Sequence, residues 1–297
     1  MKKYNILVTG LSGYIASNLV KKLLLQGNKV FALTTKNFSS EDQFETGLKV
    51  YYYDGSFSSV DYAFRNNNID FVFHLASVNS YNQDIKNIES SIDCNIKYGS
   101  YLLEAMSNNS CKYLINTGTY WQYSTYNKAK PICFYAATKQ AFEDIIDYYV
   151  LDKNLSTITL NLPDTYGPND NRKKIFSLIK ESYKNNCEVN LTDGKQLMDF
   201  LYIEDVLEGY LAAMNVVKRK TNLGKHEKYF LTSGTLKSLK EVILKYIEIT
   251  GWKVVVNWGA VPYRKNQIMK PYIGKVLPNW KPKFDLDKGL KNIAYEK

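Results

Sequence analysis

Short apolar runs alternate, along the first half of the chain, with longer segments whose apolar residues recur at helical spacing. In the first of these segments Ile15, Leu19 and Leu23 keep the helical period. Apolar runs that are buried on both faces and separated by helices predict a parallel, doubly wound sheet, which is an α/β fold. The predicted strands cover residues 4–8, 29–33, 49–53, 71–75, 113–116 and 157–162.

The pattern becomes irregular after Pro163, where short predicted strands and frequent prolines replace the regular alternation. This change predicts two domains. We expect residues 1–165 to form the doubly wound domain, with returning segments of it within about 198–232. Residues 166–297 are predicted to form a smaller α/β lobe that binds the substrate and is interleaved with the first domain.

Length and composition fit this fold. A chain of 297 residues with 45% hydrophobic residues can bury a full α/β core. No apolar run reaches the roughly 18 residues that a membrane-spanning helix needs, so we expect no membrane partner. The four cysteines lie far apart and only two histidines occur. This pattern argues against a disulfide framework and a metal site, and it fits a cytoplasmic protein.

The formal net charge of +10 is of the kind found in nucleic-acid-binding proteins. Here the excess is nearly all lysine spread along the chain, and its densest clusters cover 172–174 and 218–220. We therefore interpret the charge as a solvated lysine-rich surface that also attracts an anionic cofactor and substrate. No nucleic-acid partner is expected.

A glycine motif, Gly10-x-x-Gly13-x-x-Ala16, follows the first predicted strand and opens the first predicted helix. Gly10 permits a tight turn, Gly13 lets the backbone approach a pyrophosphate at the positive end of the helix, and small Ala16 allows close helix–strand packing. The motif predicts a dinucleotide-binding domain of the Rossmann type. Further cofactor contacts are expected in the same turn from Ser12, Tyr14 and Ile15.

The end of the second predicted strand decides which dinucleotide is expected. NAD-binding chains usually carry an acid there, which holds the ribose 2′-hydroxyl and repels a 2′-phosphate. This strand ends in Thr34, Thr35 and Lys36, without an acid. NADPH (NADP+) is therefore favoured over NAD, although Lys36 equally fits a surface lysine. Other cofactor contacts, or else ordinary loop polarity, are predicted where further strands end, at Asp54 and Gly55, at Leu75, Ala76 and Ser77, and at Leu162.

The spacing Tyr-x-x-x-Lys occurs three times, which is the number that chance gives in a lysine-rich chain with 25 tyrosines. The pair that begins at Tyr126 precedes a proline, where a helix is disfavoured. The pair that begins at Tyr149 lies near a predicted helix end. Tyr135 and Lys139 instead open an amphipathic run to Val150, so their side chains share one helix face. We select this pair.

We interpret Tyr135 as the proton donor to a substrate carbonyl. A free tyrosine has a pKa of about 10, and a lysine ammonium beside it, with the charge of oxidised nicotinamide, is expected to lower that pKa. Thr117, at the end of the preceding predicted strand, can donate a hydrogen bond to the substrate oxygen as it becomes an alkoxide. His74 is interpreted as a packed strand residue.

Together with these residues, the stretches 164–170 and 199–205 resemble the extended short-chain dehydrogenase/reductases that act on nucleotide sugars. The stretches 116–122 and 135–142 are more narrowly similar to the CDP-abequose and CDP-paratose synthases. The resemblance implies NADPH-dependent reduction of the 4-keto group of a CDP-linked 6-deoxy or 3,6-dideoxy hexose. It also implies that Lys139 holds the nicotinamide ribose, that Thr119 and Asp164 face the sugar, and that Arg264 meets the diphosphate.

Departures from the wider family narrow the reaction. In the 4,6-dehydratases an Asp and a Glu follow the active-site Thr, whereas Gly118 and Thr119 stand here. In the GDP-fucose synthases a Cys and a His carry epimerisation, and the matching positions are Thr119 and Asn169, which do not titrate near neutrality. An arginine found in many epimerases is Met198 here, which leaves the diphosphate contact open. These departures leave simple reduction of the keto group as the expected reaction.

Two alternatives stay open. An epimerase that retains NAD and inverts a centre through a transient ketone would use the same Thr117, Tyr135 and Lys139. A non-catalytic regulator would bind NADP(H) and a protein partner, although such proteins tend to lose the Tyr and Lys pair. The resemblance also implies a homodimer that pairs two helices, one of which begins at Tyr135.

Overall fold

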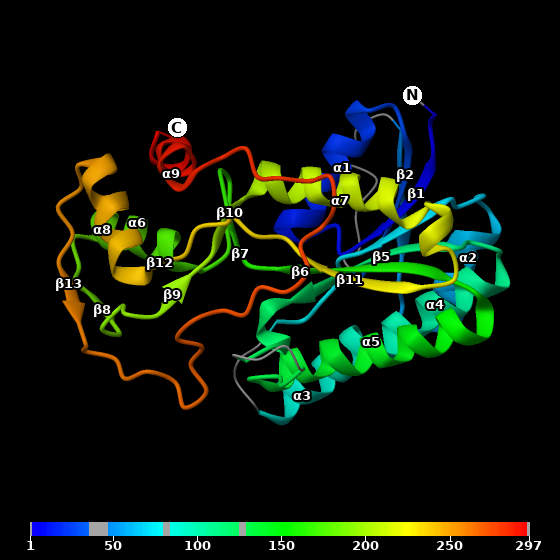
Figure 1. Cartoon of the computed structure of the whole chain (residues 1–297), viewed down its shortest axis with the longest axis horizontal. Helices are drawn as coiled ribbons and strands as arrows, with labels where there is room; N and C mark the ends of the chain where they lie inside the picture. The colour runs from blue at the N-terminus through cyan, green and yellow to red at the C-terminus, as the bar shows by residue number, and fades with distance from the viewer. Residues whose placement is uncertain (1, 36–46, 80–83, 125–128, 296–297) are drawn as a thin grey trace.

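The computed structural model describes residues 2–35, 47–79, 84–124 and 129–295. Within these ranges the main body is a seven-stranded parallel sheet with the strand order β11-β6-β5-β4-β1-β2-β3 (Figure 1). The predicted doubly wound α/β fold is confirmed. The strands are β1 (Asn5–Thr9), β2 (Lys29–Thr34), β3 (Leu48–Tyr52), β4 (Phe71–His74), β5 (Tyr113–Thr119), β6 (Ser156–Leu162) and β11 (His226–Phe230).

Helices cover both faces of the sheet (Figure 1). One face carries α1 (Tyr14–Leu25) and α7 (Ile203–Val217). The other side carries α2 (Phe57–Arg65), α3 (Ile85–Ile92), α4 (Tyr98–Asn108) and α5 (Phe134–Lys153), with a π-helical turn, η1 (Asp93–Lys97), between α3 and α4. No helix within the described ranges is both long and apolar enough to cross a membrane.

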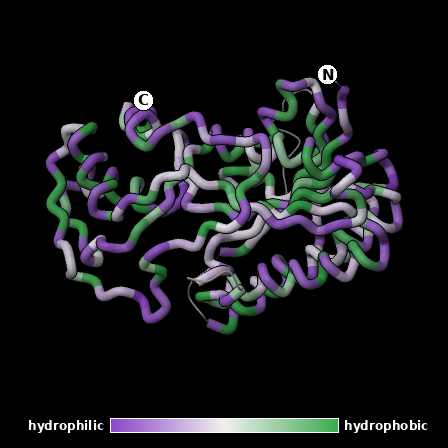
Figure 2. The backbone as a smooth tube through the Cα atoms, viewed as in Figure 1, coloured by the Kyte–Doolittle hydropathy of each residue, from purple (hydrophilic) through white to green (hydrophobic). Residues whose placement is uncertain are grey.

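The alternation of side chains along the central strands produces two separate cores. Ile6 and Val8 of β1 belong to the core under α1 and α7, whereas Leu7 between them belongs to the core under α2 and α4. Successive side chains of a strand point to opposite faces, so a strand covered on both faces is apolar throughout. Figure 2 shows these strands as a hydrophobic centre between more polar helices.

Two predicted strands differ from the structure in detail. β5 continues past Asn116 to Thr119, because 117–119 pairs with 160–162 of β6. β3 was expected to be buried on both faces, and that expectation was wrong. Among the described residues β3 is one of the two edge strands of the sheet and pairs with β2 alone, and its Lys49 and Tyr52 are exposed.

The smaller lobe lies beyond the carboxyl ends of β5 and β6 (Figure 1). The chain enters it after β6 and returns to the sheet as α7 and β11, so the two parts are interleaved. Two short 3-10 turns, η2 (Tyr120–Gln122) and η3 (Lys220–Asn222), follow β5 and α7. The lobe contains α6 (Ile175–Asn185), α8 (Leu239–Thr250) and α9 (Leu286–Ala294), and the strand pairs β7 (Asp164–Tyr166) with β10 (Phe200–Tyr202), β8 (Val189–Leu191) with β13 (Val256–Trp258), and β9 (Leu197–Met198) with β12 (Lys237–Ser238).

Asp205 ties the C-terminal segment to the first turn of α7. Its buried carboxylate accepts hydrogen bonds from the backbone N–H groups of Lys283, at 2.8 Å, and Phe284, at 2.9 Å. Its carbonyl oxygen accepts a third from the indole of Trp280 at 3.0 Å. This one residue therefore fixes the path of the chain between the sheet and α9.

We expect Asp205→Ala to lower the free energy of unfolding by about 3 kcal/mol, because two amides lose a charged acceptor. Asp205→Asn, which keeps one acceptor oxygen, should lose less. Equilibrium unfolding in urea measures both, and Asp152→Ala, which removes an exposed carboxylate, is the matched control. Wild-type stability of Asp205→Ala would contradict the proposed anchor.

Candidate active site

A cavity of about 570 Å³ lies where the carboxyl edge of the sheet meets the lobe. Doubly wound proteins bind their ligands at this edge of the sheet. Both parts of the chain contribute, from the glycine turn to α6. Of the residues predicted from the sequence, the cavity brings together Gly10, Gly13, Tyr14, Ile15, Leu75, Ser77, Thr117, Thr119, Tyr135, Leu162, Asp164 and Arg264.

The remaining predicted residues do not line this cavity. Thr34 is buried at the end of β2, and Thr35 follows it on the surface. Asp54, Gly55 and Ser12 are exposed in their turns, whereas Ala76 and Lys139 are buried behind the cavity wall. Lys36 and Tyr126 lie outside the described residues.

The glycine turn is held by a close contact between the ends of β1 and β4. Gly10 has a φ of +80°, and a Cβ at this position would lie 2.8 Å from the backbone of Ala76. The hydroxyl of Thr9 accepts hydrogen bonds from the N–H groups of Leu75 and Ala76, both at 3.1 Å. Only glycine combines this conformation with this approach.

His74 belongs to the same contact. Its Nδ1 lies 2.9 Å from the Thr9 hydroxyl, and its ring is fully buried. Burial lowers the pKa of His74 to about 3, so the imidazole is neutral at physiological pH. The side chain does not line the cavity, which fits its interpretation as a packed strand residue.

The first turn of α1 presents its backbone amides to the cavity. Gly13 is the N-cap and supplies no side-chain cap, and the first turn contains no acid. The amides at a helix N-terminus lack intrahelical acceptors and attract anions. Gly13, Tyr14, Ile15 and Ala16 all line the cavity, so this turn fits the pyrophosphate of a dinucleotide.

Lys139 lies one helical turn after Tyr135 and is only 1% exposed. Its ammonium has no hydrogen-bond partner among the described residues. Burial lowers the pKa of Lys139 to about 8, against the opposing effects of Cys94 and Glu143. A buried amine normally has partners. This ammonium lies behind the cavity wall, and the expectation that it holds a nucleotide ribose stays a prediction.

Tyr135 differs from the sequence expectation in its acidity. The ring is buried, and burial raises the pKa of Tyr135 to about 12, offset in part by a hydrogen bond with Ser77. Lys139 is not among the groups that shift this pKa, and desolvation of the phenol is the largest effect. The expected lowering by Lys139 together with the charge of oxidised nicotinamide stays a prediction. Such a phenol is protonated at neutral pH and can donate a proton.

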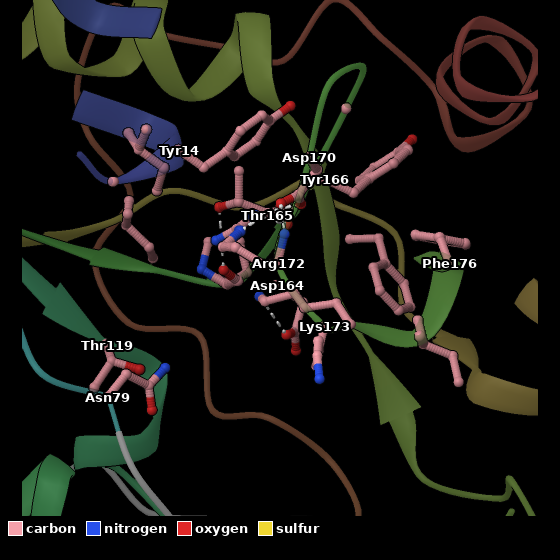
Figure 3. A pocket seen from close by; sticks show the side chains of 18 of the residues that line it. Tyr14, Asn79, Thr119, Asp164, Thr165, Tyr166, Asp170, Arg172, Lys173 and Phe176 are labelled. Carbon is pink, nitrogen blue, oxygen red and sulfur yellow. Dashed lines mark hydrogen bonds and ion pairs between the residues drawn. The ribbon is translucent and has the colours of Figure 1, made fainter. Parts of the chain in front are cut away.

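The substrate side of the cavity is built from β7 and the segment before α6 (Figure 3). The carboxylate of Asp164 accepts a hydrogen bond from the hydroxyl of Tyr120 at 2.9 Å, and its other oxygen lies 3.4 Å from the ammonium of Lys174. These two contacts therefore fix the orientation of the Asp164 carboxylate. Sequence reasoning did not find the contacts of Tyr120 and Lys174 with Asp164, because only the fold brings these side chains together.

Arg172 connects the lobe to the glycine turn (Figure 3). It donates two hydrogen bonds to Asp170, both at 2.7 Å, and one to the carbonyl of Thr165 at 2.9 Å. Its guanidinium also lies over the ring of Tyr14, 4.6 Å from the centroid. The sequence shows the cluster 172–174 as a concentration of positive charge, but it does not show which residues this cluster contacts in the fold.

The rim of the cavity is positively charged. Arg172 and Lys174 are paired with acids, whereas Lys173 and Lys180 have no ion pair within the described ranges. Arg264 adds a further cation. The arrangement suits an anionic ligand. In the described part of the chain, no group of His, Cys, Asp or Glu side chains is arranged to hold a metal ion.

Gly118 has no room for a side chain. A Cβ at this position would overlap the side-chain oxygen of Asn161 and lie 2.8 Å from the methyl of Thr159. The next residue, Thr119, is buried, and its hydroxyl accepts a hydrogen bond from the N–H of Trp121 at 3.3 Å. The positions directly after Thr117 therefore hold no titratable group.

The sequence model of the NAD dependent epimerase/dehydratase family matches residues 6–225. The chain is 25% identical to the CDP-abequose synthase of Salmonella typhimurium over 99% of its own length and 98% of that protein. It is 28% identical to the CDP-abequose synthase of Yersinia pseudotuberculosis, with 90% and 91% covered. A UDP-glucose 4-epimerase from Thermotoga maritima, solved with UDP-glucose, has the same fold, with a TM-score of 0.85, 22% identity, and 98% and 97% covered.

Lys139→Met should raise the free energy of unfolding at pH 7 by up to about 3 kcal/mol, because the native state no longer buries a charge. The folded pKa of about 8 lies below the ordinary 10.5. The cost of the charge is thus fully present below pH 8 and disappears as the pH rises toward 10.5. The stability difference between variant and wild type should shrink over this interval.

Urea unfolding at pH 7 and pH 10 measures this difference. Lys21→Met, at an exposed position on α1, is the control and should change stability little at either pH. A Lys139→Met protein that is less stable than wild type at pH 7 would contradict the free-energy cost assigned to the buried Lys139 charge.

Proposed function

Because the chain belongs to the NAD-dependent epimerase/dehydratase family, we propose that it is an NADP(H)-dependent reductase of a nucleotide-linked 4-keto sugar. The proposed substrate is a CDP-linked 6-deoxy or 3,6-dideoxy hexose. The observation that carries the proposal is the cavity in which the glycine turn, Thr117 and Tyr135 meet beneath a cationic rim. The CDP-abequose synthases that match nearly the whole chain support the choice of substrate.

The proposed roles follow from the state of each side chain. A bound nicotinamide dinucleotide supplies the hydride. Tyr135 is protonated at neutral pH and gives its proton to the carbonyl oxygen. Thr117 donates a hydrogen bond to the same oxygen as negative charge develops on it. Lys139 binds ribose hydroxyls, and the N-terminus of α1 binds the pyrophosphate.

The surroundings of Thr117 favour reduction over elimination of water. Elimination needs an acid and a base beside the sugar. Gly118 cannot carry either, because Asn161 and Thr159 occupy the space of a side chain. Thr119 is not titratable, and the two acids that line the cavity, Asp164 and Asp170, are paired with Lys174 and Arg172.

The cationic rim supports a nucleotide-linked substrate. A diphosphate needs cations, and Lys173, Lys180 and Arg264 line the cavity in addition to Arg172 and Lys174. Arg264 suits phosphate oxygens because its guanidinium presents several donors in one plane. Met198 also lines the cavity and contributes no charge.

NADPH is proposed over NADH because no acid stands at the end of β2. Thr34 ends the strand and Thr35 follows it at the surface, so a 2′-phosphate would meet no negative charge from these positions. The rival proposal is an epimerase that retains NAD, which would use the same Thr117 and Tyr135; solved UDP-glucose 4-epimerases share the fold of this chain.

We also propose a homodimer that pairs α5 with its counterpart. Tyr148 and Leu151 project from α5 and are 58% and 87% exposed. Apolar side chains that cluster on one exposed helix favour burial in an interface.

A panel of CDP-, dTDP-, GDP- and UDP-linked 4-ketosugars, offered with NADPH or NADH, tests the function. We expect oxidation of NADPH with a CDP-linked ketosugar, at least tenfold faster than with NADH. Absorbance at 340 nm follows the cofactor, and the product configuration at C4 is determined separately. Tightly retained NAD, with interconversion of UDP-sugars and no net cofactor oxidation, would establish the epimerase instead.

Tyr135→Phe should lower kcat by at least about 100-fold while dinucleotide binding survives, because only the proton donor is removed. Fluorescence titration with NADPH measures the binding. Tyr149→Phe, at the far end of α5, removes a hydroxyl from the same helix and is the control. Near-normal turnover of Tyr135→Phe would refute the assignment.

In solution the wild type should have twice the chain mass of 34.3 kDa, because α5 is proposed to pair with its counterpart. Leu151→Glu should shift the mass toward that of one chain, since it places a charge in the interface. Light scattering after gel filtration measures both proteins. A wild type of single-chain mass would contradict the dimer.

A further inference from the structure

Tyr210 of α7 makes a hydrogen bond with Thr117 of β5, 93 residues away in the chain. The two hydroxyl oxygens lie 2.7 Å apart. The Tyr210 ring packs edge-on against Phe73 and has no exposed surface, whereas Thr117 is half-buried and lines the cavity. The bond therefore joins the interior between α7 and the sheet to the site of the proposed reaction.

The direction of this bond follows from what else each hydroxyl can reach. Each has one proton to donate. Among the described residues, neither hydroxyl has another side-chain partner. If Thr117 donated to Tyr210, the phenolic proton would be left without an acceptor in the interior, at a cost of about 1–3 kcal/mol. If Tyr210 donates, its proton is satisfied and Thr117 keeps its own proton for a ligand in the cavity.

We propose that Tyr210 is a positioning residue, which donates to Thr117 and thereby directs the Thr117 proton toward the substrate oxygen. The inference rests on the proposed carbonyl chemistry. A donor whose oxygen already accepts a hydrogen bond is a stronger donor, because successive hydrogen bonds polarise one another. Tyr210 acts through Thr117 and is itself not part of the cavity wall.

The surroundings of Tyr210 agree with this role. Burial raises the pKa of Tyr210 well above its ordinary value, so the phenol keeps its proton at working pH. The ring is fixed between α7 and the sheet, in the core that also contains Val206 and Ala213. A donor held in this way keeps Thr117 in one orientation before the substrate binds.

A double-mutant cycle tests the proposal, because residues that act through one hydrogen bond have non-additive effects. Tyr210→Phe should lower kcat for the converted ketosugar roughly tenfold, with little change in KM for NADPH. In a Thr117→Val background the same substitution should change kcat by less than about twofold. In a Thr117→Ser background, which restores a hydroxyl, the full effect of Tyr210→Phe should return.

Tyr98→Phe is the matched control, because it removes another buried phenol, on the opposite face of the sheet. It should leave kcat unchanged, and thermal unfolding should show all variants folded at the assay temperature. Equal fold-losses from Tyr210→Phe in the wild-type and Thr117→Val backgrounds would overturn the positioning role, as would normal kcat in Tyr210→Phe itself.

The two proposals fail in different ways. If the wild type converts no nucleotide-linked sugar, the proposed function is wrong and the role of Tyr210 falls with it. If the wild type is active but the two substitutions are additive, the role of Tyr210 alone is wrong.

Discussion

The approach of Gly10 to the backbone of Ala76 fixes the geometry on which the rest of the site depends. Residues with a Cβ would push β1 and β4 apart at their carboxyl ends. The Thr9 hydroxyl holds the two ends together from the other side. As a result the N-terminus of α1 opens directly into the cavity that Tyr135 and Thr117 line. The contact between the backbones of Gly10 and Ala76 thus sets both the spacing of β1 and β4 and the access of a ligand to the N-terminus of α1.

The sequence predicted those parts of the fold whose cause is local. Apolar runs located six of the seven strands in the sheet, and helical spacing located α1 and α5, because each pattern repeats over a few residues. The edge position of β3 could not be predicted, because it depends on which strand has no neighbour. Tyr135, Lys139 and Thr117 were selected from their spacing and context. Tyr210, Tyr120 and Lys174 were not, because only the tertiary fold brings them to their partners.

The pKa values of the site residues also could not be predicted from the sequence. The spacing of Tyr135 and Lys139 suggests an ammonium that acidifies a phenol, but it does not report how deeply both groups are buried. In the structure burial acts on both: it raises the pKa of the phenol and lowers that of the amine. Both shifts favour neutral side chains. At neutral pH the phenol is uncharged in any case, and Lys139, whose pKa of about 8 lies above 7, still carries most of its charge and adds to the field of the cationic rim.

Gly118 has a consequence for how this chain can evolve. Acquiring a carboxylate beside Thr117 is a single codon change in the gene, but the fold does not accept it alone. Asn161 and Thr159, both on the neighbouring strand, occupy the space and would have to change first or together with it. Each of these substitutions by itself offers no new chemistry. The packing of two strands thus makes an acid at this position depend on changes at two further positions.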